Sequence, residues 1–184
     1  MTDLTPPRRL LGLLPSRVLQ ISPIEILAAA LTIGLLLLAS GLTTDLINAP
    51  LFVPSLAAST VIIFVEPGMT VSRSWNVIAG QFVSASVGMA FALTLAGRTE
   101  VAAALTMAVA LILMRVLRCL HPPALATALI IIVSPGSAHV QFLLFPVLAG
   151  SVMIVLLAWL VHLFEQRYPS RLGRSQTAVR RAGG

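Results

Sequence analysis

Four long apolar stretches constrain this chain more than any other feature of its sequence. Each holds about 20 residues, the length at which an α-helix spans the hydrocarbon core of a bilayer, and they cover 23–42, 75–96, 101–120 and 142–164. Only 10% of the 184 residues are charged and 58% are hydrophobic, whereas a soluble domain carries roughly a quarter charged residues. The sequence therefore predicts an all-α, polytopic membrane protein.

The rest of the composition argues against several classes of function. A nucleic-acid binder gathers its basic residues on one face with aromatic residues between them, but these arginines sit at the chain ends and between apolar runs. Cys119 is the single cysteine and the three histidines lie far apart, so no disulfide or metal-ligand spacing appears. We therefore expect membrane lipids as surroundings, and no nucleic-acid partner, metal or other cofactor.

Two shorter apolar runs, 51–65 and 122–133, are flanked by proline and followed by Pro-Gly pairs. A helix of a dozen residues rises only about 18 Å, so neither run spans a bilayer as a helix alone. Each must either dip into the membrane and return, or complete its crossing with extended backbone.

The arginines distinguish these two alternatives. If all six segments cross, the loops on the N-terminal side hold nearly every arginine, including Arg73, Arg115 and Arg118. Because basic residues are enriched in cytoplasmic loops, we expect six crossings with both termini cytoplasmic, in a bacterial-type inner (plasma) membrane. Four crossings with re-entrant short runs remain the alternative. The arginines ahead of the first stretch resemble a signal peptide, but the length of that stretch and its part in a repeat predict an uncleaved helix.

The two short runs are also the centre of an internal repeat. Residues 53–68 align with 121–136 at a constant offset of 68, so that Pro54 meets Pro122 and Ser59 meets Thr127. Each half then holds a long, a short and a long helix, and three crossings per half place the halves in opposite orientations. We predict two inverted three-helix repeats, each with one short Pro/Gly-bounded helix. The expected order is a cytoplasmic segment, two membrane repeats and a basic cytoplasmic tail, over 1–22, 23–97, 98–165 and 166–184.

The second short run carries a resemblance to a known family. The sequence LHPPALATAL at 120–129 resembles the His-Pro-Pro (HPP) family of integral membrane proteins, as do P-x-x-x-A-S at 54–59 and N-V-I-x-G at 76–80. Chloroplast and cyanobacterial members are associated with nitrite transport, so the resemblance implies a carrier or channel for a small anion. Ala57, Ala124 and Leu125 stand where glycine is usual in that family, a departure that bears on the identity of the substrate.

The starts of the two short helices form the predicted substrate site. The residue before a proline favours extended backbone, the state of a helix N-cap, so we expect His121 at the N-cap and Pro122 at the first helical position. Helix N-termini carry partial positive charge and bind anions. The expected substrate-binding residues are Ser55, Ser59, Asn76, Arg118, His121, Pro122, Pro123 and Thr127. The alternative is that the two prolines only start a helix.

These observations favour transport of a small anion bound near the bilayer midplane, and the resemblance adds nitrite. A channel for a small neutral solute and a non-transporting accessory subunit are the alternatives, and no motif indicates an enzyme. Gly80, Ser84 and Gly88 recur every four residues, a pattern that lets helices pack closely. This face serves packing either within the chain or in a homo-oligomer, a dimer or a trimer.

Overall fold

The computed structural model describes residues 23–47, 54–95, 99–134 and 140–167, and every regular element in these ranges is a helix. The long helices are α2 (Pro23–Ile47), α4 (Ser74–Thr94), α5 (Thr99–Val116) and α8 (Gly150–Arg167). The short helices are α3 (Pro54–Val65), α6 (Ala124–Val133) and the 3-10 helix η2 (Thr70–Ser72). The predicted all-α class is confirmed for this part of the chain. The predicted N-terminal segment and nearly all of the basic tail lie outside it.

The surface of the bundle is apolar. Leu31, Leu93 and Val116 are each at least 65% exposed, although soluble monomers rarely expose large apolar patches. Two of the described helices, Ser74–Thr94 and Val140–Phe164, are long and apolar enough to cross a membrane. An apolar exterior around these helices is expected of a protein whose solvent is lipid.

The last apolar stretch forms one continuous helix with a local change of geometry. It runs from α7 (Val140–Phe142) through the π-helix η4 (Leu143–Ala149) into α8. Pro146 lies inside η4, and a proline removes one backbone donor and clashes with the carbonyl four residues earlier. The wider π-turn accommodates this clash without ending the helix.

Helix α5 ends earlier than the apolar stretch 101–120 predicts. Arg118 adopts a left-handed backbone conformation with φ of 54°, and the backbone N–H groups of Arg118 and Cys119 donate to the carbonyls of Arg115 and Met114. This pair of bonds is a Schellman motif, which terminates a helix. The expectation of a helix reaching Leu120 is therefore wrong, because the chain turns at Arg118.

The start of α6 also differs from the prediction. Backbone N–H groups of Ala124, Leu125 and Ala126 donate to carbonyls three residues earlier, beginning at His121. Because two prolines follow His121, Ala124 is the first residue that can donate, and a tight 3-10 turn precedes the α-helix. The prediction of His121 as N-cap and Pro122 as first helical residue is therefore wrong, and Pro123 holds the N-cap position.

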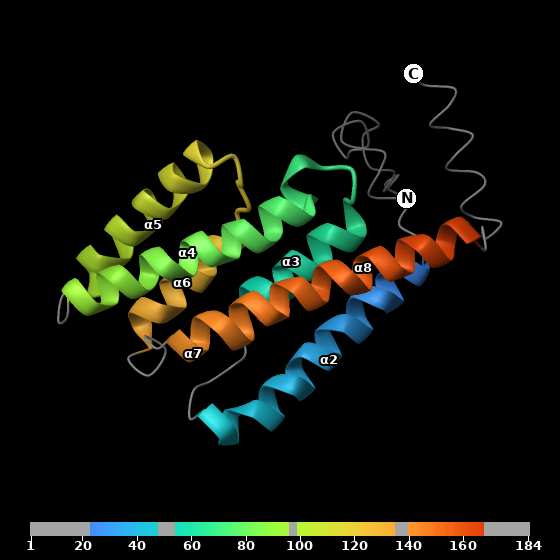
Figure 1. Cartoon of the computed structure of the whole chain (residues 1–184), viewed down its shortest axis with the longest axis horizontal. Helices are drawn as coiled ribbons and strands as arrows, with labels where there is room; N and C mark the ends of the chain where they lie inside the picture. Colours follow the sequence, from blue (N-terminus) through green and yellow to red (C-terminus); the bar gives the residue numbers. More distant parts are fainter. Residues whose placement is uncertain (1–22, 48–53, 96–98, 135–139, 168–184) are drawn as a thin grey trace, which may run out of the picture.

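Helices α3 and α6 begin near the middle of the bundle and extend toward opposite ends (Figure 1). Helix α4 packs against α6 along its small residues, where a Cβ on Gly80 would lie 2.8 Å from His121 Cβ and one on Gly88 would lie 2.8 Å from the Ala128 carbonyl oxygen. The glycines of the small-residue face therefore serve packing within the chain. A homo-oligomer stays a prediction.

Candidate functional site

A group of fully buried polar side chains lies where α3, α4 and the start of α6 meet. We call it the polar cluster; none of its members is more than 1% exposed, and they are Ser55, Ser59, Gln81, His121 and Thr127. Their positions follow from the helices, because Ser55 and Ser59 lie one turn apart on α3. The apolar residues around them exclude solvent.

The hydroxyl and amide groups of the cluster are bonded to one another. Thr127 Oγ1 donates to Gln81 Oε1 at 2.5 Å, and the Ser55 hydroxyl bonds Thr127 Oγ1. Gln81 Nε2 donates to Ser59 Oγ at 3.1 Å and to Ser55 Oγ at 3.4 Å. Gln81 therefore links both short helices to the centre of α4.

Both ring nitrogens of His121 have partners. Nδ1 lies 2.8 Å from the carbonyl oxygen of Val71, and because a carbonyl only accepts, Nδ1 carries a hydrogen. Nε2 lies 2.7 Å from Ser59 Oγ. The imidazole thus connects the segment before α4 to the hydroxyl group on α3.

The Ser59 hydroxyl has two acceptors for a single hydrogen. Its oxygen lies 2.6 Å from the carbonyl oxygen of Ser55 and 2.7 Å from His121 Nε2. With a neutral ring, only one of these contacts can hold a hydrogen. With a protonated ring, Nε2 donates to Ser59 and Ser59 donates to Ser55, so the cluster has a place for one additional proton.

The structure brings together four of the eight residues that the sequence predicts for the site, namely Ser55, Ser59, His121 and Thr127. Asn76 is buried beside them, and its Nδ2 donates to the Leu120 carbonyl oxygen at 3.0 Å. It positions the segment before His121.

The other three predicted residues lie outside the polar cluster. Arg118 is exposed at the end of α5, Pro122 is exposed, and Pro123 is partly buried. The turn at Arg118 directs the chain from α5 toward the cluster, and the prolines shape the entry to α6. Their place in the structure supports a role in positioning His121.

Sequence reasoning missed Gln81, whose side chain bonds Ser55, Ser59 and Thr127. The signal was present, because a long amide side chain in the middle of the apolar stretch 75–96 is costly in a bilayer unless it is paired. Its position on α4, one residue after Gly80, directs it toward α3 and α6.

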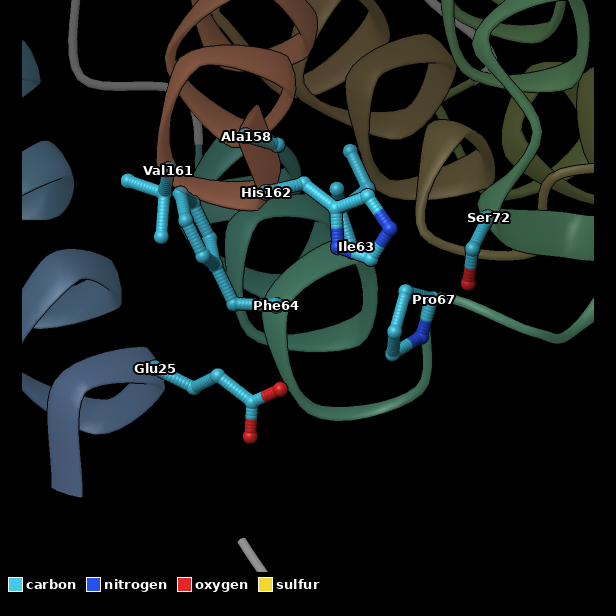
Figure 2. A pocket seen from close by; sticks show the side chains of 8 residues that line it. All are labelled: Glu25, Ile63, Phe64, Pro67, Ser72, Ala158, Val161 and His162. Atoms are coloured by element: carbon cyan, nitrogen blue, oxygen red, sulfur yellow. The ribbon is translucent and has the colours of Figure 1, made fainter. Parts of the chain in front are cut away.

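A pocket of about 170 Å³ opens at the end of the bundle where α2 begins and α3 and α8 end. Figure 2 shows the His162 side chain reaching toward Ile63 and Pro67, with Glu25 approaching from α2. Ser72 also lines this pocket, and it follows Val71, whose carbonyl holds His121. The pocket therefore lies one residue from a direct contact of the polar cluster.

Comparison with known proteins agrees with the membrane architecture. The family model for the HPP transmembrane region matches residues 17–169. Two transmembrane proteins of Dictyostelium discoideum are 36% and 37% identical over 122 residues, which cover 62% of this chain and 39% and 43% of the relatives.

The chain thus spans about two-fifths of the length of the curated relatives it matches. No solved structure gives a significant match. The family model covers most of the chain and includes both short helices and the His-Pro-Pro segment. This protein is a membrane protein of the HPP family.

Proposed function

We propose that this protein transports a small inorganic anion such as nitrite across a bacterial-type inner membrane, with the polar cluster as its substrate site. The observation that carries the proposal is the burial of five polar side chains where apolar helices meet. Polar groups inside a membrane are costly and usually functional.

The chemistry of the cluster suits an anion. Its hydroxyl, amide and imidazole groups supply hydrogen-bond donors, and no carboxylate belongs to it. The hydroxyl and amide donors are bonded within the cluster, and His121 Nδ1 bonds the Val71 carbonyl, so an anion would bind by replacing bonds inside the cluster with bonds to itself. This exchange keeps buried donors satisfied in both states.

The arrangement of α3 and α6 adds electrostatic support. Ser55 contacts Thr127 and Ser59 contacts His121, so the first turns of the two helices run past each other in opposite directions. Two N-termini bring two partial positive charges together. A bound anion between them would reduce their repulsion and would be stabilised in return.

The proposed architecture is two inverted repeats with both termini cytoplasmic. Arg73, Arg115 and Arg118 lie at the end of the bundle where α4 begins and α5 ends. The hydrogen bond from Asn76 to the Leu120 carbonyl connects the start of α4 to the segment that follows α5. The positive-inside rule makes it the cytoplasmic end.

Uptake into proteoliposomes tests the function. The purified protein should take up nitrite, and Ser55→Ala and His121→Ala should each lower the initial rate by about tenfold, the effect of losing one hydrogen bond to a charged ligand. Ser86→Ala is the matched control on α4, because this hydroxyl bonds only the Phe82 carbonyl of its own helix. If nitrite, nitrate, formate and chloride all fail to enter above the background of empty liposomes, the proposal is wrong.

A further inference from the structure

The two halves of the chain bury many of the same positions. At an offset of 70 residues, buried residues of α4 pair with buried residues of the last helix: Val77 with Val147, Gly80 with Gly150, Gln81 with Ser151 and Ser84 with Ile154. At an offset of 68, the same holds for α3 and α6: Leu56 with Ala124, Ser59 with Thr127, Thr60 with Ala128 and Ile63 with Ile131. The alignment of buried positions at these offsets makes α8 the counterpart of α4, and α6 the counterpart of α3.

Counterpart positions nevertheless pack differently. Gly88 on α4 touches α6 so closely that a Cβ would lie 2.8 Å from the Ala128 carbonyl oxygen. Its counterpart on α8 is Ala158, which lines the pocket beside α3. The same position is therefore closed in one half and open in the other.

Another residue of the pocket repeats this difference. His162 lines it and is exposed, whereas its counterpart Ala92 is half-buried in the half where α4 and α6 are in contact. Packed helix interfaces have discrete arrangements and do not deform continuously. The two repeats share one pattern of buried positions, but α4 packs closely against α6 whereas α8 leaves a pocket beside α3. This difference indicates that each repeat can adopt both arrangements.

We infer that this protein is an alternating-access carrier and that the structure shows the state open at the pocket between α3 and α8. In the second state, α3 and α8 close against each other, while α4 and α6 separate and open an equivalent pocket lined by Gly88, Phe91, Ala92 and Ile131. This inference rests on the proposed transport function and excludes a continuously open channel. Inverted repeats that exchange conformations produce such a cycle.

The polar cluster lies between the observed pocket and the predicted one. Ser59 and Thr127, which are counterparts, come from the two short helices whose partners would change. Gln81 on α4 bonds both. Movement of α4 relative to α6 would therefore change the bonds of the cluster at the same time as it changes access.

Labelling of single cysteines tests the inference without any transported anion. In a chain with Cys119→Ala, a membrane-impermeant maleimide should label His162→Cys rapidly from the side that the pocket faces and Ala92→Cys slowly. Adding Gly88→Ala places a Cβ against the α6 backbone, and it should speed labelling of Ala92→Cys from the opposite side by roughly tenfold while slowing His162→Cys. Gly34→Ala is the matched control, because nothing lies within 4 Å of that Cβ.

A second variant acts in the opposite direction. Ala158→Leu adds bulk where α8 must approach α3, and it should leave His162→Cys reactive, protect Ala92→Cys further and lower nitrite uptake. Parallel changes at the two cysteines, or rapid labelling of both from opposite sides in the unmodified background, would overturn the inference. If nitrite enters but the labelling rates of the two cysteines do not change in opposite directions, the protein transports nitrite as a channel and the carrier inference is wrong. Opposite labelling changes without uptake of any anion would support the carrier and reject the proposed substrate.

Discussion

Arg118 holds a backbone conformation that costs an ordinary residue free energy. Its φ of 54° lies in the left-handed region, where a side chain costs roughly 1–2 kcal/mol. Glycine is the usual residue at this position of a Schellman motif. Arginine therefore ends this helix at a cost that glycine would avoid, and it places a positive charge three residues before His121.

Replacing Arg118 separates its conformation from its charge. Arg118→Gly should raise the free energy of unfolding by about 1 kcal/mol, because it relieves the left-handed strain, whereas Arg118→Gln should leave it nearly unchanged. Both variants should slow nitrite uptake, because both remove the charge on the approach to the polar cluster. Thermal unfolding in detergent and proteoliposome uptake measure the two effects. Unchanged uptake in both variants would limit Arg118 to setting the membrane orientation.

The Ser59 hydroxyl and its two acceptors predict a dependence on pH. Protonation of His121 adds a donor and a positive charge to the cluster, so nitrite uptake should increase as the pH falls below about 6.5, the unperturbed pKa of histidine. His162→Gln, which changes a histidine that lines the pocket, is the control. An unaltered pH profile in His121→Gln would show that another group is responsible.

At the scale of elements, the sequence locates the short helices well and their ends less well. Proline and the Pro-Gly pairs bound α3 and α6 because these residues cannot continue a helix. The end of α5 was missed because its left-handed residue is an arginine and not a glycine. The π-turn around Pro146 was missed because a single proline in an apolar run does not reveal how the helix accommodates it.

The contact between the two short helices is predicted to stabilise the fold. Ser55 and Thr127 are hydrogen-bonded across α3 and α6, so a double-mutant cycle with Ser55→Ala and Thr127→Val should give a coupling free energy of about 1 kcal/mol. Thermal unfolding of the four proteins provides it. Strictly additive effects would mean that the two helices are held together by other contacts.

At the scale of the whole molecule, the sequence predicts four of the five residues of the polar cluster from two observations. The repeat pairs Ser59 with Thr127, and the prolines place Ser55 and His121 at the starts of short helices. Gln81 could not be identified in this way, because its role depends on the rotation of α4 against α6, which Gly80 and Gly88 set through backbone contact. The apolar residues of α4 are distributed around the helix, so its hydrophobic pattern does not predict this rotation.

Six crossings place the two Pro-Gly loops on opposite sides of the membrane. Gly68 is exposed with open space around it, and Ser137, outside the described residues, follows the second Pro-Gly pair. In a Cys119→Ala background, Gly68→Cys should react from the cytoplasmic face and Ser137→Cys from the outer face. Labelling of both from the outer face would instead show four crossings with re-entrant short helices.

The most direct test of the central claim, that the polar cluster is the anion site, is nitrite uptake by variants of Gln81. Gln81→Leu removes the amide that bonds Ser55, Ser59 and Thr127, and Gln81→Glu replaces a donor with an acidic group of the same shape. Both variants should lose nitrite uptake by about tenfold or more, while Ser86→Ala keeps the wild-type rate and all three proteins elute alike in size-exclusion chromatography. Wild-type uptake in folded Gln81→Leu and Gln81→Glu proteins would contradict the claim and place the anion elsewhere.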